Sequence, residues 1–458
     1  MFSGRIPLVW PGGVFQNTGV TTGAIDINPA SGQSTIFLSN GQPVTFRPDV
    51  NNQYSGADFG LTGLRTFPQG ELNIIAKDFK MPQVLRTTLG FDKRIGNGWT
   101  FNIEGIFTKN IEEVDWTNLL FDPTKRVGTT GPDKRTVYDP RLSLDNRKIV
   151  LRPYLTVASQ RNPYTSIILI SNNEDRKGYA YNFTAGVDKA FRQGWAFNAN
   201  YTYGNSVVKN EATSSVNSSN WNNMETINGR NYNGLTTSDF DLGHRLYAYV
   251  SKTFNYLKGR LSTTVTVDYT GQSGNPFTYT MTGNITQDGV NFNDQMYIPT
   301  AAEVQQMAFA NNTTGGVTYT AAQQRAFFEE HIQKDKYLSK HRGEFAGRNE
   351  ARLPFTHLFT MKAQQDFNVK VGDNTYKLQV IYDMFNVANF LDENRGRQYF
   401  ANFDQVQILQ FAGYQSGTTT PQYRFTPLVS GRGYSVSDGV NTYNSSRWSS
   451  QLTFRVTF

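Results

Sequence analysis

The protein has 458 residues, 44 Lys and Arg against 37 Asp and Glu, and no cysteine. Its 14% of aromatic residues contrasts with a mean hydropathy of −0.51. The basic residues are scattered, which argues against nucleic-acid binding because that requires a dense positive patch. No run of about 18 apolar residues is present, so transmembrane helices are excluded. An aromatic-rich yet hydrophilic chain fits either a membrane β-barrel or a carbohydrate-binding β-sandwich.

Residues 1–80 contain no clear strand pattern, and we expect them to form an extracellular loop or irregular segment. The opening residues MFSGRIPLVWPGG lack a basic stretch followed by an apolar one. An exported barrel carries such a signal peptide. We therefore expect the chain to be a part of a longer protein.

The first strand pair is predicted at 84–93 and 99–108. Leu85, Leu89 and Phe91 alternate with polar residues, which is the period of a strand with two different faces. The segment 96–98 (GNG) separates the two runs, and Asn-Gly between alternating runs indicates a hairpin. Trp99 follows this turn directly, where an interfacial aromatic girdle would place it.

The same unit recurs along the chain and ends in a single last strand. The short turns lie near Gly194, Gly259 and Gly372, and Trp195 again follows its turn. The strand at 245–254 alternates poorly. The further predicted strands are 179–191, 195–203, 245–254, 261–269, 355–369, 376–382 and 448–458.

Long segments rich in Asn, Gly, Thr and Ser connect the hairpins, at roughly 111–177, 205–242, 271–353 and 390–446. Short turns at one end and long loops at the other are typical of outer-membrane barrels, with the turns in the periplasm. Within one loop, the segment 321–338 has the composition of a helix.

The fold class is therefore predicted to be all-β: an antiparallel transmembrane β-barrel portion of about nine to eleven strands, taken from a larger barrel. The strands are longer than the usual ~5–6 residues of a soluble β-sandwich. Nine strands alone would leave both sheet edges unpaired in lipid. We therefore expect N-terminal strands to come from outside the chain.

The C-terminal strand carries the pattern of an assembly signal. Trp448, Leu452, Phe454, Val456 and Phe458 share one face, and Phe458 is the last residue. The pattern resembles the terminal β-signal that the barrel assembly machinery recognises. The alternative is an ordinary last strand.

Several short stretches lie in a characteristic order and spacing across most of 80–458. They are KGYAYN at 177–182, YTYG at 201–204, DLGHR at 241–245, GQSGNPF at 271–277, YIP at 297–299, HRG at 341–343, RN at 348–349, PFTH at 354–357 and FNVANFL at 385–391. Together these stretches resemble those of Oar-like TonB-dependent receptors, relatives of the SusC-type transporters of Bacteroidetes. The last stretch is similar to the family's FNxxNLLN motif, in which Asp392 replaces the usual Asn.

The resemblance implies a transporter barrel. The family also carries a carboxypeptidase-regulatory-like domain, a TonB box and a plug at its N-terminus, and none of these is found in 1–458. The chain is accordingly expected to be a partial barrel domain, with 1–80 irregular and 81–458 forming strands and loops. It would meet TonB only through the missing plug.

Catalytic and metal-binding interpretations find little support. The histidines lack metal-ligand spacing, and they are His244, His331, His341 and His357. Asp366 and Asp383 fall on predicted lumen-facing positions, where polar lining is the simpler interpretation than a paired-carboxylate site. Asp392 and Glu393 are read as a solvated acidic turn rather than a calcium site.

We therefore expect a non-enzymatic outer-membrane receptor without cofactors that takes up a large nutrient such as a peptide or glycan. Its expected partners are outer-membrane lipid, the assembly machinery, and the missing strands and plug, with no nucleic acid. An outer-membrane adhesin or assembly component, and a secreted carbohydrate-binding β-sandwich, are the alternatives. The sequence does not identify the substrate.

Overall fold

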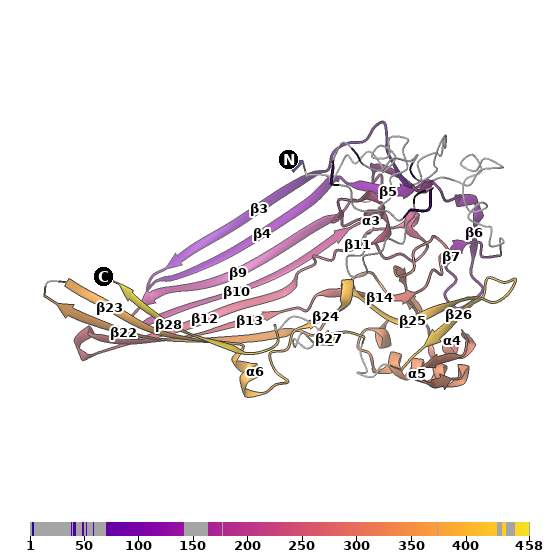
Figure 1. The fold of residues 1–458 in the computed structure, drawn as a ribbon. Coiled ribbons are helices and arrows are strands. Elements are labelled where there is room, and N and C mark those ends of the chain that lie inside the picture. The colour runs from indigo at the N-terminus through magenta and orange to yellow at the C-terminus, as the bar shows by residue number, and fades with distance from the viewer. Residues whose placement is uncertain are drawn as a thin grey trace.

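The computed structural model describes residues 70–141, 164–175, 177–372, 374–427, 433–436 and 445–457, together with 2–3, 38, 40–42, 48–49, 52 and 58. One long antiparallel sheet occupies one end of the molecule, and a mixed assembly of shorter strands and helices occupies the other (Figure 1). No helix in the described part of the chain is long and apolar enough to cross a membrane.

The long sheet consists of nine strands, each paired antiparallel with its neighbours in chain order. This confirms the predicted all-β class and each predicted strand. Two short strands, β1 (Phe2–Ser3) and β11 (Thr236–Thr237), pair with β3 and β10. The nine are β3 (Gln83–Ile95), β4 (Trp99–Glu112), β9 (Tyr179–Arg192), β10 (Trp195–Val208), β12 (Gly243–Tyr256), β13 (Leu261–Gln272), β22 (Thr356–Val371), β23 (Asn374–Phe385) and β28 (Ser449–Thr457).

Tight turns join these strands in pairs at one end of the sheet (Figure 1). Asn97 and Gly98 have φ of 55° and 80°, and Gln193 and Gly194 have 52° and 78°. Positive φ at two successive residues matches the right-handed twist of the strands, which Gly and Asn accept at low cost. The third turn is the 3₁₀ segment η5 (Leu257–Gly259). The short connections therefore all lie on one side, as predicted.

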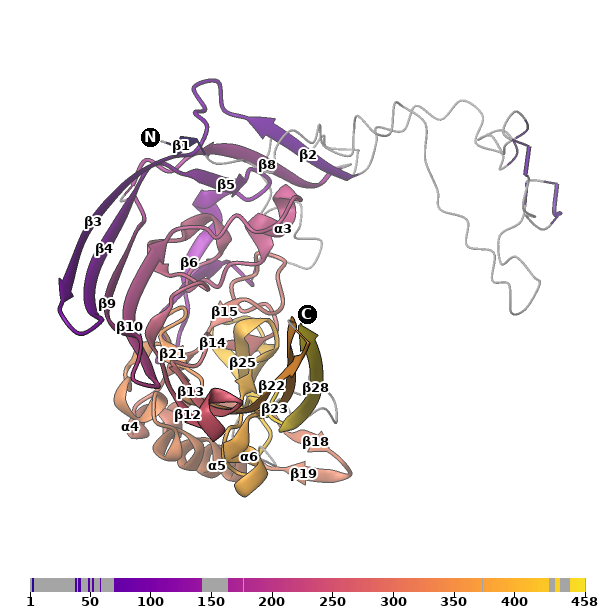
Figure 2. The ribbon, with the colours of Figure 1, turned by 90° about the vertical axis from the view of Figure 1, so that its left-hand side faces the viewer.

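The sheet is curved but open within the described residues. It bends into a trough when viewed from the turn end (Figure 2). One edge strand, β28, pairs with β23 alone, and β3 pairs with β4 and with the two residues of β1. No described pairing joins β28 to β3.

The long connections after β13 and β23 fold together into one unit, which we call the loop domain (273–353 and 399–427). Parallel pairing joins β14 to β25 and β17 to β26, so each connection supplies strands to the other. The α5 helix ends four residues earlier than the predicted 338, because Asp335 is extended. The elements are β14 (Pro276–Thr282), β15 (Asp294–Gln295), β16 (Tyr297–Ile298), α4 (Ala301–Gln306), β17 (Ala308–Phe309), β18 (Asn312–Thr314), β19 (Val317–Tyr319), α5 (Ala321–Lys334), η6 (Leu338–Lys340), β20 (Glu344–Phe345), β21 (Ala351–Arg352), β24 (Tyr399–Phe400), η7 (Asn402–Asp404), β25 (Gln405–Tyr414) and β26 (Pro421–Phe425).

A second small sheet stands beside the loop domain. Here β2 (Gly70–Ile75) pairs parallel with β8 (Tyr164–Asn172), which pairs with β5 (Val114–Asn118). The assignment of all of 1–80 as irregular is thus wrong for β2, because the strand was too short and its partner too distant to give a local pattern. The remaining elements are η2 (Pro123–Lys125), β6 (Arg126–Gly128), β7 (Thr136–Tyr138), α3 (Asn217–Asn222), η4 (Arg230–Tyr232), α6 (Val387–Leu391) and β27 (Ser435–Val436).

Candidate functional site: an apolar outer face, a polar trough and the base of the loop domain

The convex face of the long sheet is apolar, and most of its described side chains are exposed or half-buried. The register of the strands joins Phe197, Val250, Val267, Met361 and Met384 into one lateral row. Rows above and below repeat this pattern. An exposed apolar surface of this extent is typical of an interface with lipid or protein. Among the exposed side chains of this face are Leu85, Leu89, Phe91, Phe101, Ile103, Phe183, Leu378, Leu452, Phe454 and Val456.

Aromatic and basic side chains border this face at the turn end. The Lys189 ammonium lies 5.3 Å from the ring centre of Trp99, and that of Lys252 lies 4.5 Å from Trp195. The tryptophans stand where the sequence predicted a girdle. Tryptophan with lysine is the combination expected where hydrocarbon meets water.

A second border lies at the loop end. The Tyr201 hydroxyl is 2.7 Å from Nδ1 of His244, and the Tyr269 hydroxyl is 2.8 Å from Nδ1 of His357. Tyr269 leans over Gly271, where a Cβ would come within 2.3 Å of its hydroxyl. Two amphipathic belts therefore bound one apolar band, as in a membrane-spanning sheet.

The concave face is polar. One lateral row on this face contains Thr100, Asp188, Asn198, Tyr249, Asp268 and Thr360. Asp366 accepts hydrogen bonds from Gln379 at 2.8 Å and lies 3.0 Å from the Lys377 ammonium. Its cross-strand partner Gln379 is four residues from Asp383 on β23, about 14 Å along a strand. The two aspartates therefore do not form a paired-carboxylate site, and they line the polar trough separately.

The loop domain has a closed apolar core. Buried residues from both long connections share it, including Phe277, Tyr279, Phe328, Val406 and Phe425. A smaller core around Trp116, Ile168 and Trp221 joins the second sheet to α3. Among the described residues, segments that the sequence presented as polar loops thus hold most of the packed interior.

At the base of the loop domain, Arg348 binds three carboxylates. Its Nε lies 2.7 Å from Glu225, its Nη1 3.1 Å from Glu211, and its Nη2 2.5 Å from Asp239. The side chain of Arg348 is 1% exposed. Burial raises the pKa of Glu211, which the nearby guanidinium partly opposes. The cluster fastens the connection after β10 to the connection after β13.

The residues around this cluster come from stretches that the sequence singled out. Asn349 donates to Asp239 and to the carbonyl of Thr237. Arg352 forms an ion pair with Asp241, whose other oxygen accepts from the amide of Ser206. The sequence marked Arg348, Asn349 and Asp241 by resemblance but gave no signal for Glu211 and Glu225, which come from distant, motif-free segments.

The connection between β4 and β9 is held by a second buried arginine. Arg135 pairs with Asp133 at 2.7 Å and donates to the carbonyl of Gln295 at 2.9 Å. The amide of Tyr138 donates to the carbonyl of Thr286. Residues 133–138 of this connection therefore pack against the loop domain.

The remaining sequence candidates are dispersed. His331 is half-buried in α5, where this partial burial lowers its pKa, and His341 stacks on Tyr337 with ring centres 4.1 Å apart. Asp392 pairs with Arg395 at 3.3 Å. Nowhere in the described ranges do three or more His, Asp or Glu side chains gather to hold a metal ion.

The proposed assembly signal is only partly described. Leu452, Phe454 and Val456 lie on the convex face of β28 and are 57%, 68% and 59% exposed. Trp448 precedes the strand and contacts Phe390 with ring centres 5.0 Å apart. Phe458 lies outside the described residues.

Comparisons with known proteins show the family to which the chain belongs. The outer membrane beta barrel domain family matches residues 10–392. A search of curated proteins gave no match. Among solved structures, the chain is similar to the outer membrane transporter YddB from Escherichia coli, with a TM-score of 0.33 and 10% identity over 87% of this chain and 36% of that one. It thus spans about a third of the length of that neighbour.

The family match covers most of the long sheet and the loop domain, and it excludes the secreted β-sandwich alternative. The open antiparallel sheet, its apolar convex face and its two aromatic belts have the features that such a domain requires. The chain belongs to the outer membrane beta barrel domain family, and it is a protein of the outer membrane.

Proposed function

We propose that this chain is part of a TonB-dependent receptor of the Oar-like kind, which moves a large nutrient such as a peptide or glycan across the outer membrane. The observation that carries the proposal is the polar trough of the nine strands, which leads to a packed loop domain at its mouth. Strands β14, β15 and β25 stand within the opening of the trough in the view from the turn end (Figure 2). A packed loop domain at the mouth of a polar trough suits the selective capture of a nutrient before transport.

Two of the stretches that resemble the family meet at the base of the loop domain. Asp241, just before β12, forms an ion pair with Arg352 of β21, which lies outside those stretches and also donates to the carbonyl of Gly274 after β13. A Cβ on Gly274 would come within 2.3 Å of the Leu353 carbonyl oxygen, so this approach requires glycine. Asp241 and Gly274 therefore help to position the loop domain relative to the trough.

The two open sheet edges define the proposed partners. The outer edge of β3 and that of β28 present backbone groups that lipid cannot satisfy. We propose that strands beyond those described complete the barrel, and that a plug joins it and contacts TonB. The terminal strand, with Leu452, Phe454 and Val456, is the proposed contact for the barrel assembly machinery, and the turns face the periplasm.

Nutrient uptake in a deletion strain tests the transport role. The strain would be offered fluorescent oligopeptides and oligosaccharides, with and without dissipation of the proton-motive force. We expect energy-dependent uptake of one class to disappear and to return on complementation with the full gene. Unchanged uptake of every compound, with loss of surface attachment instead, would favour the adhesin alternative.

A further inference from the structure

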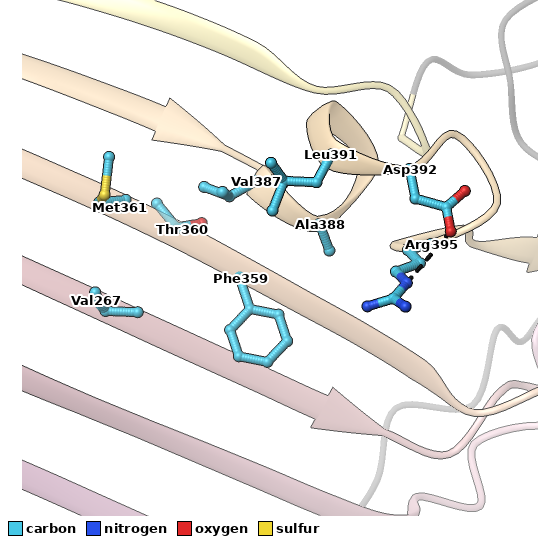
Figure 3. Close-up of a pocket in the computed structure, with 9 residues that line it drawn as sticks. All are labelled: Val267, Phe359, Thr360, Met361, Val387, Ala388, Leu391, Asp392 and Arg395. Carbon is cyan, nitrogen blue, oxygen red and sulfur yellow. Dashed lines mark ion pairs between the residues drawn. The ribbon is translucent and has the colours of Figure 1, made fainter.

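A groove lies on the convex face of the sheet beside the short helix α6. It has a volume of about 580 Å³. Its floor is Val267, Phe359 and Met361 from β13 and β22, and its wall includes Ala388 and Leu391 of the helix (Figure 3). Arg395 and Asp392 stand at one end. An apolar groove of this size with one charged end suits a ligand that has an apolar chain and a polar head.

The helix that forms the wall is held firmly. Asn386, with φ of 54°, turns the chain away from β23. The side-chain Nδ2 of Asn386 donates to the backbone carbonyls of Gly396 and Ser446, both at 2.9 Å. The groove is therefore a fixed feature of the barrel wall.

The groove opens on the side that faces lipid. Val267 and Met361 belong to the apolar row that runs through Phe197 and Val250. On the helix, Leu391 is 76% exposed and Phe390 is 53% exposed, and no described core accounts for either side chain. Bare apolar side chains on a membrane protein's outer face are expected to contact lipid chains.

The level of the groove is that of the loop-end belt. Phe359 packs against Tyr269 with ring centres 4.8 Å apart, and Tyr269 reaches His357. Phe390 packs against Trp448 on the other side. Such belts mark the boundary between headgroups and acyl chains, so the groove lies where a lipid chain begins.

The charged end of the groove is available to a headgroup. The pair between Arg395 and Asp392 is 3.3 Å long, and the side chains are 73% and 43% exposed. An ion pair this exposed contributes little energy and exchanges readily. A guanidinium binds phosphate oxygens well, in a two-pronged geometry.

We propose that this groove binds one acyl chain of a phosphate-bearing outer-leaflet lipid, with the phosphate on Arg395. The groove is continuous with the lipid-facing surface, which makes lipid its occupant. The leaflet rests on the proposed orientation of the turns, whereas the binding itself rests only on the outer-membrane sheet. The site is separate from the polar trough and from any transported nutrient.

Native mass spectrometry of the full protein, purified from outer membranes and titrated with phosphatidylglycerol or with the diacylglycerol of the same acyl chains, which has no phosphate, tests the proposal. Ala388→Trp fills the groove, and Ala185→Trp places the same ring on the convex face of β9 as the matched control. Arg395→Ala removes the headgroup contact. Arg397→Ala, in the same loop and outside the groove lining, is its control.

We expect one phosphatidylglycerol molecule to be held more tightly than diacylglycerol. Ala388→Trp should weaken its binding at least about tenfold, since two or more buried methylenes are displaced. Arg395→Ala should remove the preference for phosphatidylglycerol, and both controls should bind as the wild type does. If the Ala388 and Ala185 variants bind phosphatidylglycerol equally well, the groove is not the lipid site. If the wild type forms a dimer that only Ala388→Trp abolishes, the occupant of the groove is a second copy of the chain and not a lipid. An unchanged preference in Arg395→Ala would overturn the placement of the phosphate.

Discussion

Replacement of Arg348 by Met should open the base of the loop domain. The guanidinium is buried, and the side chains of Glu225 and Glu211 are only 5% and 7% exposed. Without it both carboxylates remain buried with no counter-charge from Arg348. Breaking a buried pair by removing one partner costs about 3–5 kcal/mol. Asp239, at 31% exposed, adds at most about 1 kcal/mol.

A matched control exists in the same domain. Arg342 pairs with Glu329 at 2.8 Å, but these side chains are 20% and 16% exposed and join neighbouring parts of one connection. Its replacement by Met should cost only about 1 kcal/mol. The double variant Arg348→Met with Glu225→Gln should recover part of the loss, because it removes one of the unpaired charges.

Protease susceptibility in intact cells measures this difference. Cleavage of a folded segment follows the population of its locally open form. A loss of about 4 kcal/mol raises that population roughly a thousandfold, since each 1.4 kcal/mol is tenfold. The Arg348 variant should therefore be cut within 205–242 and 271–353 far faster than the Arg342 variant. Equal cleavage rates for the two variants would refute the view that Arg348 fastens the connections.

Three further outcomes are expected. Burial, with Asp239 and Glu225 nearby, raises the pKa of Asp404 to about 6, so the loop domain loses stability as pH rises from the ordinary pKa of 3.8 to about 6. Asp404→Asn should therefore stabilise the loop domain by about 1 kcal/mol at pH 7, after allowance for solvent screening, but not at pH 3.5, as melting curves at both pH values would reveal. Protease on intact cells should cut the wild type only within 111–177, 205–242, 271–353 or 390–446, and cleavage at Gly96 or Gly194 would reverse the proposed orientation. Deletion of Phe458 from the full protein should lower the amount of heat-modifiable barrel in outer membranes, whereas normal amounts would make the terminal pattern an ordinary strand end.

The nine strands were predictable because their signals are local. Alternating side chains and turns such as Asn97-Gly98 lie within one hairpin, and the strands begin and end within a few residues of the prediction. The strand at 245–254 alternated poorly because Tyr247 and Tyr249 lie on the concave face. There the Tyr247 hydroxyl donates to Asp268 at 3.1 Å, so an aromatic ring serves a polar surface.

The loop domain was not predictable for the opposite reason. Its central pairing joins Thr278 in β14 to Gln405 in β25, in parallel and across more than a hundred residues. Parallel partners of this kind leave no turn signal between them. The Arg348 cluster likewise joins an arginine of the connection after β13 to three acids of the connection after β10, and only the resemblance marked any of its members. One helix, α5, was found because its composition is a local signal.

The two parts of the protein are stabilised by different solvents. Among the described residues, almost all buried hydrophobic side chains lie outside the nine strands. Within the nine strands, only Ile381 and Met384 are buried. The long sheet therefore has no core of its own, and its convex face becomes buried only in lipid. The loop domain, by contrast, buries Phe328, Ile332 and Val406 completely, as a water-soluble domain does. Substitutions within the loop domain should therefore leave the sheet undisturbed, provided that the Arg348 cluster still fastens the two together.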